Sequence, residues 1–324
     1  MAYATRHNDL AATLRADEDV EMNVSLPKCL RVFSTALFAI LLLALATHAE
    51  DHPRLPAGVR FEDVVLQSKA LQNRYMSYRV VLPESIPPDA KLPVVWLLHG
   101  WGSNYRTWSM DSDIGELAAR GVVLVMVEDR NTLFVNSATN KDYRAEDYFI
   151  DEVVPDVRRR FPVAIDPARN AIAGISLGGF EAISLALRHP QMFSYAGGIS
   201  PAILMAARAF PASAISLAIN DALGPMGSET RNASDPFQLI EAPQPDAPIP
   251  YFYLTCGDSE NLRAPIELFA KLLKQRGLPY KLNMARGGHN WAQWNLQIPG
   301  LESSLLQHFG IDDGRRGGKK SKKP

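Results

Sequence analysis

Short apolar runs alternate with amphipathic segments along most of the chain. A short apolar run between polar turns is typical of a strand that is covered on both faces of its sheet. Apolar residues that recur at a spacing of three or four positions are typical of helices. Strands that alternate with helices in this way predict an α/β protein with a mostly parallel central sheet and helices on both faces.

The pattern also predicts where the elements lie. Pro155 falls inside one long apolar stripe, and we expect it to kink that helix because proline cannot donate a backbone hydrogen bond. The predicted strands span residues 61–66, 78–83, 94–98, 122–127, 170–173, 195–199, 249–255 and 280–284. The predicted helices span residues 113–120, 145–161, 177–188, 264–276 and 301–309, with shorter apolar helices at 202–210 and 212–223.

The segment Gly174-Ile175-Ser176-Leu177-Gly178 joins a predicted strand to a predicted helix. A serine on such a sharp turn has a strained backbone, and its neighbours two positions away must lack bulky side chains. Both neighbours are glycines. The turn also directs the Leu177 N–H and the positive end of the helix toward the serine oxygen, where negative charge develops in acyl transfer. Ser176 is therefore the candidate nucleophile; the alternative is an ordinary serine in a glycine-rich turn.

A serine nucleophile needs a base and an acid. His289 follows the last predicted strand in a glycine-containing loop and is the candidate base. Asp258 and Glu260 both follow the strand that ends near Cys256, and either carboxylate can fix the imidazole tautomer and stabilise the imidazolium. Their spacing does not decide which of the two is the acid. The order serine, acid, histidine is that of the α/β-hydrolases.

The loop His99-Gly100-Trp101 follows the predicted strand 94–98. In an α/β-hydrolase, an N–H group from this loop is the second oxyanion donor beside the residue that follows the nucleophile. The backbone N–H groups of Trp101 and Leu177 are therefore the candidate oxyanion hole. We expect His99 to be structural, because its neighbours belong to the loop-forming motif and not to a base position.

The chain has 324 residues, 47% of them hydrophobic, and a formal net charge of −1. These values fit one large globular domain, here residues 50–310, and do not suggest nucleic acid binding. Residues 28–31 are basic, residues 32–46 are apolar and small residues lead to Ala49, which is the pattern of a secretory signal peptide. We assign residues 1–49 to an N-terminal extension and signal peptide and expect export to the periplasm or the medium. Two alternatives remain: a true start at Met22, or an uncleaved leader that anchors the protein in a membrane.

Little else in the composition points to a special site. Cleavage would remove Cys29, so Cys256 has no disulfide partner and should be a small buried side chain. No Cys or His spacing indicates a metal site, and the chemistry needs no cofactor. Residues 311–324 are rich in glycine and lysine, and we expect a disordered basic tail that solubilises the protein or contacts an anionic envelope surface.

Several segments together resemble the esterase D or putative-esterase group, which includes S-formylglutathione hydrolases, feruloyl and acetyl esterases and antigen 85 mycolyltransferases. The resemblance covers roughly residues 80–309. It implies the α/β-hydrolase fold and an acyl-enzyme on Ser176. It also favours Glu260 over Asp258, because Glu260 occupies the acid position after Cys256-Gly257, and it supports the Trp101 and Leu177 amides. The segments that carry it are residues 94–100, 148–155, 174–179, 234–237 and 287–291.

The resemblance implies an exported serine carboxylesterase that acts on short-acyl or sugar-linked esters. A small-molecule ester is the expected partner, and export argues against formylglutathione, whose detoxification is cytoplasmic. The alternatives are an acyltransferase of mycolyltransferase type and a non-catalytic module that binds carbohydrate or the envelope. Asn131, Asn136 and Trp291 are candidate substrate contacts, although Trp291 and Trp294 can equally anchor the last helix. The helices 202–210 and 212–223 either cap Ser176 or pack on the sheet.

Overall fold

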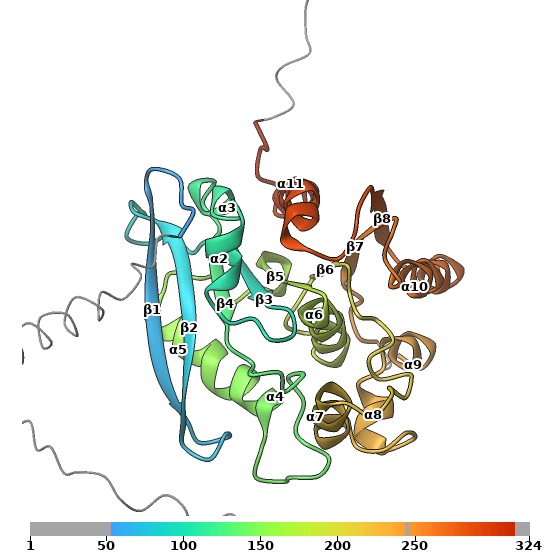
Figure 1. Cartoon of the computed structure of the whole chain (residues 1–324). Coiled ribbons are helices and arrows are strands. Elements are labelled where there is room, and N and C mark those ends of the chain that lie inside the picture. The colour runs from blue at the N-terminus through green and yellow to red at the C-terminus, as the bar shows by residue number, and fades with distance from the viewer. Residues whose placement is uncertain (1–52, 244–245, 315–324) are drawn as a thin grey trace, which may run out of the picture. The chain divides into compact units, whose positions relative to one another are not determined.

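The computed structural model describes residues 53–243 and 246–314. The predicted leader, with Met22 and Ala49, and residues 315–324 of the predicted tail lie outside the described residues. The described part forms an eight-stranded sheet with helices on both faces (Figure 1). This arrangement confirms the predicted α/β class with a mostly parallel sheet. None of the helices in this part of the chain is long and apolar enough to cross a membrane.

The strands follow the order β1-β2-β4-β3-β5-β6-β7-β8 across the sheet. β1 and β2 pair antiparallel with each other, β2 pairs antiparallel with β4, and the remaining neighbours are parallel. Each strand contains or overlaps one of the predicted apolar runs. Their bounds are β1 Val59–Ser68, β2 Arg74–Pro83, β3 Val94–Leu98, β4 Val123–Val127, β5 Asn170–Ile175, β6 Tyr195–Ile199, β7 Tyr251–Gly257 and β8 Tyr280–Ala285.

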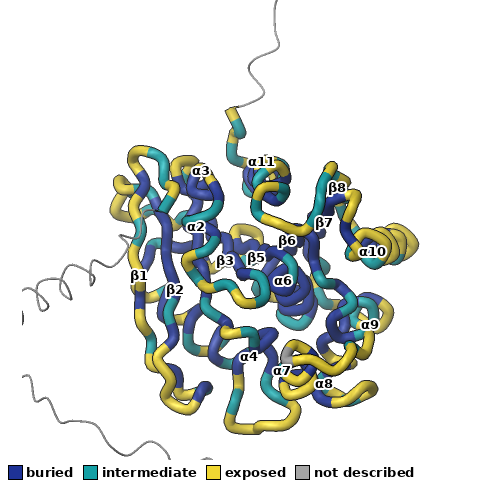
Figure 2. Tube along the Cα trace, viewed as in Figure 1, coloured by how far each residue is buried: buried dark blue, intermediate teal, exposed yellow. Residues whose placement is uncertain are grey.

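Alternate residues of the central strands serve two separate cores. Trp96 and Val125 face one core with helices α5 (Val154–Arg160), α6 (Leu177–Arg188) and α10 (Arg263–Gln275). Leu97 and Leu124 face the other core with α2 (Thr107–Asp111), α3 (Glu116–Ala119) and α11 (Trp291–His308). Since successive side chains of a strand point to opposite faces, a wholly apolar strand can supply both cores. In Figure 2 the central strands are buried, whereas much of β1 is exposed.

The helices are mostly short. They are α2 Thr107–Asp111, α3 Glu116–Ala119, α4 Ala145–Asp147, the π-helix η1 Tyr148–Val153, α5 Val154–Arg160, the 3₁₀ helix η2 Pro167–Arg169, α6 Leu177–Arg188, α7 Ala214–Leu223, α8 Glu229–Ala233, α9 Pro236–Glu241, α10 Arg263–Gln275 and α11 Trp291–His308. The predicted helix 145–161 is interrupted by η1, which ends just before Pro155. A π-helical stretch at this point is a local break in the regular hydrogen bonding, as expected near a proline.

Two predicted helices are wrong in extent or existence. Residues 202–210 form successive turns instead of a helix, and the Ala206 carbonyl accepts a hydrogen bond from the buried Arg231 side chain. The last helix begins at Trp291 rather than at residue 301 and contains Pro299. Asn290 caps its first turn by accepting a hydrogen bond from the Gln293 N–H, and packing of its apolar face compensates for the proline.

The boundary of the C-terminal tail also changes. Ile311 packs against the core that contains α11, and the Arg120 side chain donates hydrogen bonds to the carbonyls of Asp312 and Asp313. Residues 311–314 therefore belong with the folded domain rather than with the predicted tail. Cys256 is fully buried in β7, as expected for a small structural side chain.

Candidate active site

The parallel strands end at one edge of the sheet and bring distant loops together. Leu98 pairs with Gly174, Ile175 pairs with Ile199, and Gly257 pairs with Ala285. The segments that directly follow these strands are residues 99–102, 176, 200, 258–260 and 286–290. Every candidate catalytic residue lies in one of these segments, because a parallel sheet collects the carboxyl ends of its strands.

Ser176 lies on a sharp turn between β5 and α6. Its backbone has φ 56° and ψ −114°, a strained conformation for a residue that is not glycine. A Cβ atom on Gly174 would lie 2.1 Å from the Gly178 carbonyl oxygen, and one on Gly178 would lie 2.4 Å from the Leu98 carbonyl oxygen. The turn therefore requires both glycines, for the steric reason given by the sequence.

Ser176, His289 and Glu260 form a continuous chain of hydrogen-bonded side chains. The Ser176 Oγ atom lies 2.8 Å from His289 Nε2, and His289 Nδ1 lies 2.7 Å from Glu260 Oε2. The His289 side chain is 39% exposed and the Glu260 side chain only 1%. The sheet edge thus presents an accessible serine–histidine pair that is backed by a buried carboxylate.

The Glu260 carboxylate is held by several donors. Its Oε1 atom accepts hydrogen bonds from the Ser200 hydroxyl at 2.7 Å and from the Gly257 N–H at 2.8 Å. The Trp294 indole N–H donates to the Ser200 oxygen at 3.3 Å, and the Trp294 ring meets the His289 ring edge-on. Burial alone would raise the pKa of Glu260, but the hydrogen bonds from His289, Ser200 and Gly257 hold that pKa below its ordinary value.

Sequence reasoning did not identify Ser200. It directly follows β6 at the carboxyl edge of the sheet, so its position relative to a predicted strand was the available signal. Its backbone lies in the left-handed region with φ 48°, and its side chain is fully buried.

Asp258 lies in different surroundings from the buried Glu260. Its carboxylate is exposed and accepts hydrogen bonds from the Gly287 N–H at 3.0 Å and from the Ser259 hydroxyl. The Gly287 N–H is also the main cause that lowers the pKa of Asp258. Asp258 therefore holds the loop that carries His289, and it makes no hydrogen bond to the imidazole itself.

Two backbone N–H groups lie near the serine without partners. The Leu177 N–H is in the first turn of α6, and the Trp101 N–H follows Gly100, where an added Cβ atom would lie 3.5 Å from the Ser176 Cβ atom. Neither N–H has a hydrogen-bond acceptor in the described part of the chain. Unpaired N–H groups at the start of a helix and in an adjoining loop are suited to binding an oxyanion.

The three candidate substrate contacts have different surroundings. Asn131 Oδ1 accepts a hydrogen bond from the Gly102 N–H at 2.8 Å, so it lies against residues 99–102, the oxyanion loop. Asn136 instead exchanges hydrogen bonds with Asp147 and supports a local hairpin. Trp291 packs edge-on against the buried Trp108, which indicates an anchor for α11.

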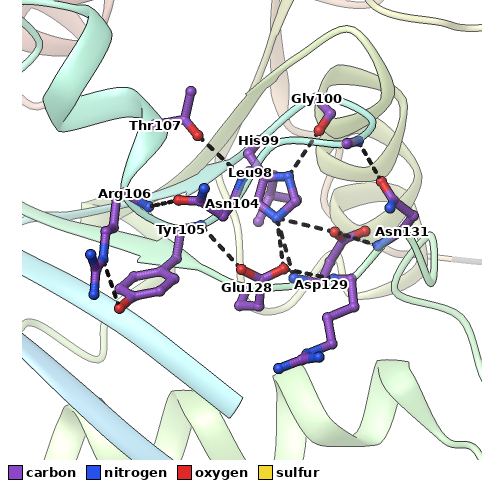
Figure 3. A network of polar contacts seen from close by, with 12 residues as sticks. Leu98, His99, Gly100, Asn104, Tyr105, Arg106, Thr107, Glu128, Asp129 and Asn131 are labelled. Carbon is purple, nitrogen blue, oxygen red and sulfur yellow. Dashed lines mark hydrogen bonds and ion pairs between the residues drawn. The ribbon is translucent and has the colours of Figure 1, made fainter. Parts of the chain in front are cut away.

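His99 lies at the centre of a sealed ionic cluster (Figure 3). Its Nδ1 atom lies 2.9 Å from the Gly100 carbonyl oxygen, and its Nε2 atom lies 3.2 Å from Asp129 Oδ1 and 3.4 Å from Glu128 Oε1. Burial alone would lower the pKa of His99, but the two carboxylates and the carbonyl raise it to about 9. His99 is therefore an imidazolium that ties the loop after β3 to the loop after β4.

The cluster continues to Glu181 on the nucleophile helix α6. Both Glu181 oxygens and the Asp129 Oδ2 atom are buried, and no N–H or O–H group in the described residues donates to them. Burial and the neighbouring Asp129 carboxylate raise the pKa of Glu181 well above its ordinary value. Burial and the neighbouring negative charge therefore both favour the protonated form of Glu181 over the ionised form.

His99, Glu128 and Asp129 are also the candidate metal ligands in the described residues, since one ligand atom from each lies within 4.8 Å of the others. The two carboxylate oxygens that face His99 already accept hydrogen bonds from backbone N–H groups. Glu128 Oε1 accepts from the Arg130 N–H at 3.0 Å, and Asp129 Oδ1 accepts from the Asn131 N–H at 2.8 Å. We therefore interpret the group as an ion pair.

Comparison with known proteins agrees with this geometry. A sequence profile of the family described as "Putative esterase" matches residues 68–304, well over half of the chain. The chain belongs to this esterase family. The esterase is 26% identical over 215 residues to an acetyl esterase of Caldicellulosiruptor saccharolyticus, a match that covers 64% of this chain and 80% of that relative. As a member of this family, it is a carboxylic ester hydrolase.

A second relative is much longer. The esterase is 25% identical over 229 residues to an endo-1,4-beta-xylanase/feruloyl esterase of Xylanibacter ruminicola. The match covers 67% of this chain but only 27% of that protein. Among solved structures, the fluorophosphonate-binding serine hydrolase F of Staphylococcus aureus superposes with a TM-score of 0.68 at 22% identity, covering 78% of this chain and 99% of that one. At this identity the likeness establishes the fold alone.

Proposed function

We propose that the esterase is an exported serine carboxylesterase that hydrolyses short-acyl or sugar-linked esters through an acyl-enzyme. The observation that carries the proposal is the hydrogen-bonded chain from Ser176 through His289 to Glu260. A similar acetyl esterase and a similar xylanase/feruloyl esterase support short-acyl and sugar-linked substrates.

The proposed reaction has two halves. His289 Nε2 takes the proton of the Ser176 hydroxyl as its oxygen attacks the ester carbonyl, and Glu260 holds the other ring nitrogen and stabilises the imidazolium. The N–H groups of Trp101 and Leu177 stabilise the resulting oxyanion, each contributing about 3 kcal/mol. His289 then protonates the departing alcohol. Water then attacks the acyl carbonyl and gives its proton to His289, which passes it to the Ser176 oxygen as the acid leaves.

Hydrolysis of 4-nitrophenyl esters from acetate to palmitate tests this proposal. We expect activity on the short esters and a loss of about 10⁴-fold or more in Ser176→Ala. An organophosphonate should label the wild type and leave the variant unlabelled. Absence of both hydrolysis and labelling would contradict the catalytic assignment, whereas preference for long acyl chains and a sugar acceptor would favour the acyltransferase.

Export is a separate part of the proposal and rests on the predicted leader. We expect N-terminal sequencing of the protein from its native cells to begin just after Ala49. A mature protein that starts at Met1 or Met22 and sediments with membranes would instead support the uncleaved anchor.

A further inference from the structure

A cavity of about 360 Å³ is lined by residues of β2, of the segment after β4 and of α7. One of its walls includes Asn131, which accepts a hydrogen bond from the Gly102 N–H directly after Trp101. Another wall includes Ala222 of α7, which belongs to the same apolar cluster as Leu177. The hydrogen bond of Asn131 therefore links this cavity to the loop that carries the Trp101 N–H.

We propose that this cavity binds a carboxylate carried by the ester substrate. The inference rests on the proposed esterase function and deepens it, because it names a substrate class: esters that bear an anionic group on the acyl or the alcohol part.

The charges around the cavity favour an anion. Arg74 and Arg130 line it, against one carboxylate, Asp221. No carboxylate among the described residues pairs with the Arg130 guanidinium. Among the described residues, the polar contacts of the Arg74 guanidinium are those with the hydroxyl and the ring of Tyr143. A guanidinium matches the geometry of a carboxylate with two parallel N–H groups, so an available arginine beside an ester-binding site is suited to this group.

A buried hydroxyl gives a second, independent indication. Thr132 lines the cavity and is only 8% exposed, yet its Oγ1 atom has no hydrogen-bond partner in the described structure. A buried hydroxyl without a partner is unfavourable, and such groups are uncommon in native proteins. An acceptor that enters the cavity would satisfy the Thr132 hydroxyl.

The wall of the cavity is fixed to the oxyanion loop by the His99 cluster. Arg130 and Asn131 have left-handed backbones, with φ 52° and 60°. Their N–H groups donate to Glu128 and Asp129, and these same carboxylates contact His99, as Figure 3 shows for the labelled residues. Backbone strain that is held in this way sets a binding group in place before the ligand arrives.

Two pairs of matched substrates test the proposal. 4-Acetoxybenzoate against neutral 4-acetylphenyl acetate places the charge on the leaving group. 4-Nitrophenyl hydrogen glutarate against 4-nitrophenyl valerate places it on the acyl part. We expect the ratio of kcat/KM for charged over neutral ester to fall about tenfold in Arg130→Gln for one of these pairs, as expected for loss of a charge-assisted hydrogen bond. Thr132→Val should lower the same ratio about threefold.

Arg169→Gln is the matched control. Arg169 is exposed and directly precedes β5, at the end of the strand opposite Ser176, and its substitution changes the net charge equally. We expect an unchanged ratio. Equal ratios in wild type and Arg130→Gln for both pairs would overturn the proposal, as would an Arg130 effect confined to neutral sugar esters.

A binding measurement separates this inference from the proposed function. Calorimetric titration of the wild-type protein with glutarate or 4-hydroxybenzoate requires no hydrolysis. If no ester is hydrolysed but binding is abolished by Arg130→Gln, the esterase function fails and the carboxylate site stands. If neutral esters are hydrolysed and neither carboxylate binds, the inference fails and the esterase function stands.

Discussion

Two histidine–carboxylate clusters lie at the same edge of the sheet in opposite surroundings. His289 contacts Glu260 and has a side chain that is 39% exposed. His99 contacts Asp129 and Glu128 and has a side chain that is 2% exposed. The second ring nitrogen of His289 faces the Ser176 hydroxyl, whereas that of His99 faces the Gly100 carbonyl.

The difference shows that residue types alone do not make a catalytic pair. A general base needs one ring nitrogen that is free to accept a proton from the nucleophile. Both ring nitrogens of His99 face buried partners, the Gly100 carbonyl on one side and the Asp129 and Glu128 groups on the other, so neither is free for a nucleophile and His99 orients a loop. His289 donates from one nitrogen and presents the other to a serine.

Glu260 and Asp129 each have a further side chain beside them, and the two side chains differ in kind. Ser200 donates a hydrogen bond to Glu260, which favours the ionised carboxylate. Glu181 is a second acid near Asp129, and burial together with the Asp129 charge raises the pKa of Glu181. The acid of the accessible cluster therefore has a hydroxyl donor beside it, whereas the sealed cluster has a second buried carboxyl group.

The largest expected effect comes from the acid of the accessible cluster. Glu260→Gln keeps the shape of the side chain but can no longer stabilise the imidazolium or select its tautomer. We expect kcat on 4-nitrophenyl acetate to fall by about 10³- to 10⁴-fold. Asp258→Asn is the matched control and should stay within about tenfold, because Asp258 only supports the loop. The reverse order would assign the acid to Asp258.

The next effect concerns the sealed cluster. The pKa of His99 is raised from an ordinary 6.5 to about 9, so its stabilising contribution is complete below pH 6.5 and is lost as the pH rises through 9. We expect the stability advantage of the wild type over His99→Gln to shrink by about 3 kcal/mol across this range. Urea unfolding at about pH 6 and about pH 10 measures it. Parallel pH curves would show that His99 is neutral.

A smaller effect is expected from the outer partner of Glu260. Ser200→Ala leaves the Gly257 N–H as the only donor to Oε1. We expect kcat to fall about tenfold with little change in KM, and the acidic limb of the kcat profile to move to higher pH because the pKa of Glu260 rises. Ser259→Ala removes a neighbouring hydroxyl that contacts Asp258 instead and should change neither quantity. An unmoved acidic limb in Ser200→Ala would argue against this support.

The smallest effect is expected from Glu181→Gln. An amide can donate to Asp129 Oδ2 as a protonated acid can, so we expect the free energy of unfolding to change by less than about 1 kcal/mol. Glu181→Ala, which leaves a cavity and an unpaired Asp129 oxygen, should cost about 3 kcal/mol. Equal losses for the two variants would show that Glu181 is ionised.

The sheet and the nucleophile turn could be predicted because their signals are local. Buried parallel strands such as Val94–Leu98 need apolar side chains on both faces, and this leaves a continuous run in the sequence. Gly174 and Gly178 flank Ser176 because any side chain would clash with the backbone of the turn. The extents of two helices could not be predicted locally. The turns at 202–210 depend on the contact with Arg231, and the early start of α11 depends on packing around Pro299.

The sequence by itself determined the strands, the nucleophile turn and the set of residues that reach one edge of the sheet. Only the tertiary structure decided their partners. Spacing alone left Asp258 and Glu260 tied, and the fold turns Glu260 inward to His289 and Asp258 outward to Gly287. Ser200 directly follows a predicted strand, but its partners, like the surroundings of Glu181 and of the Arg130 cavity, come from other strands or loops. Such pairs form only when a parallel sheet brings the ends of separate strands together.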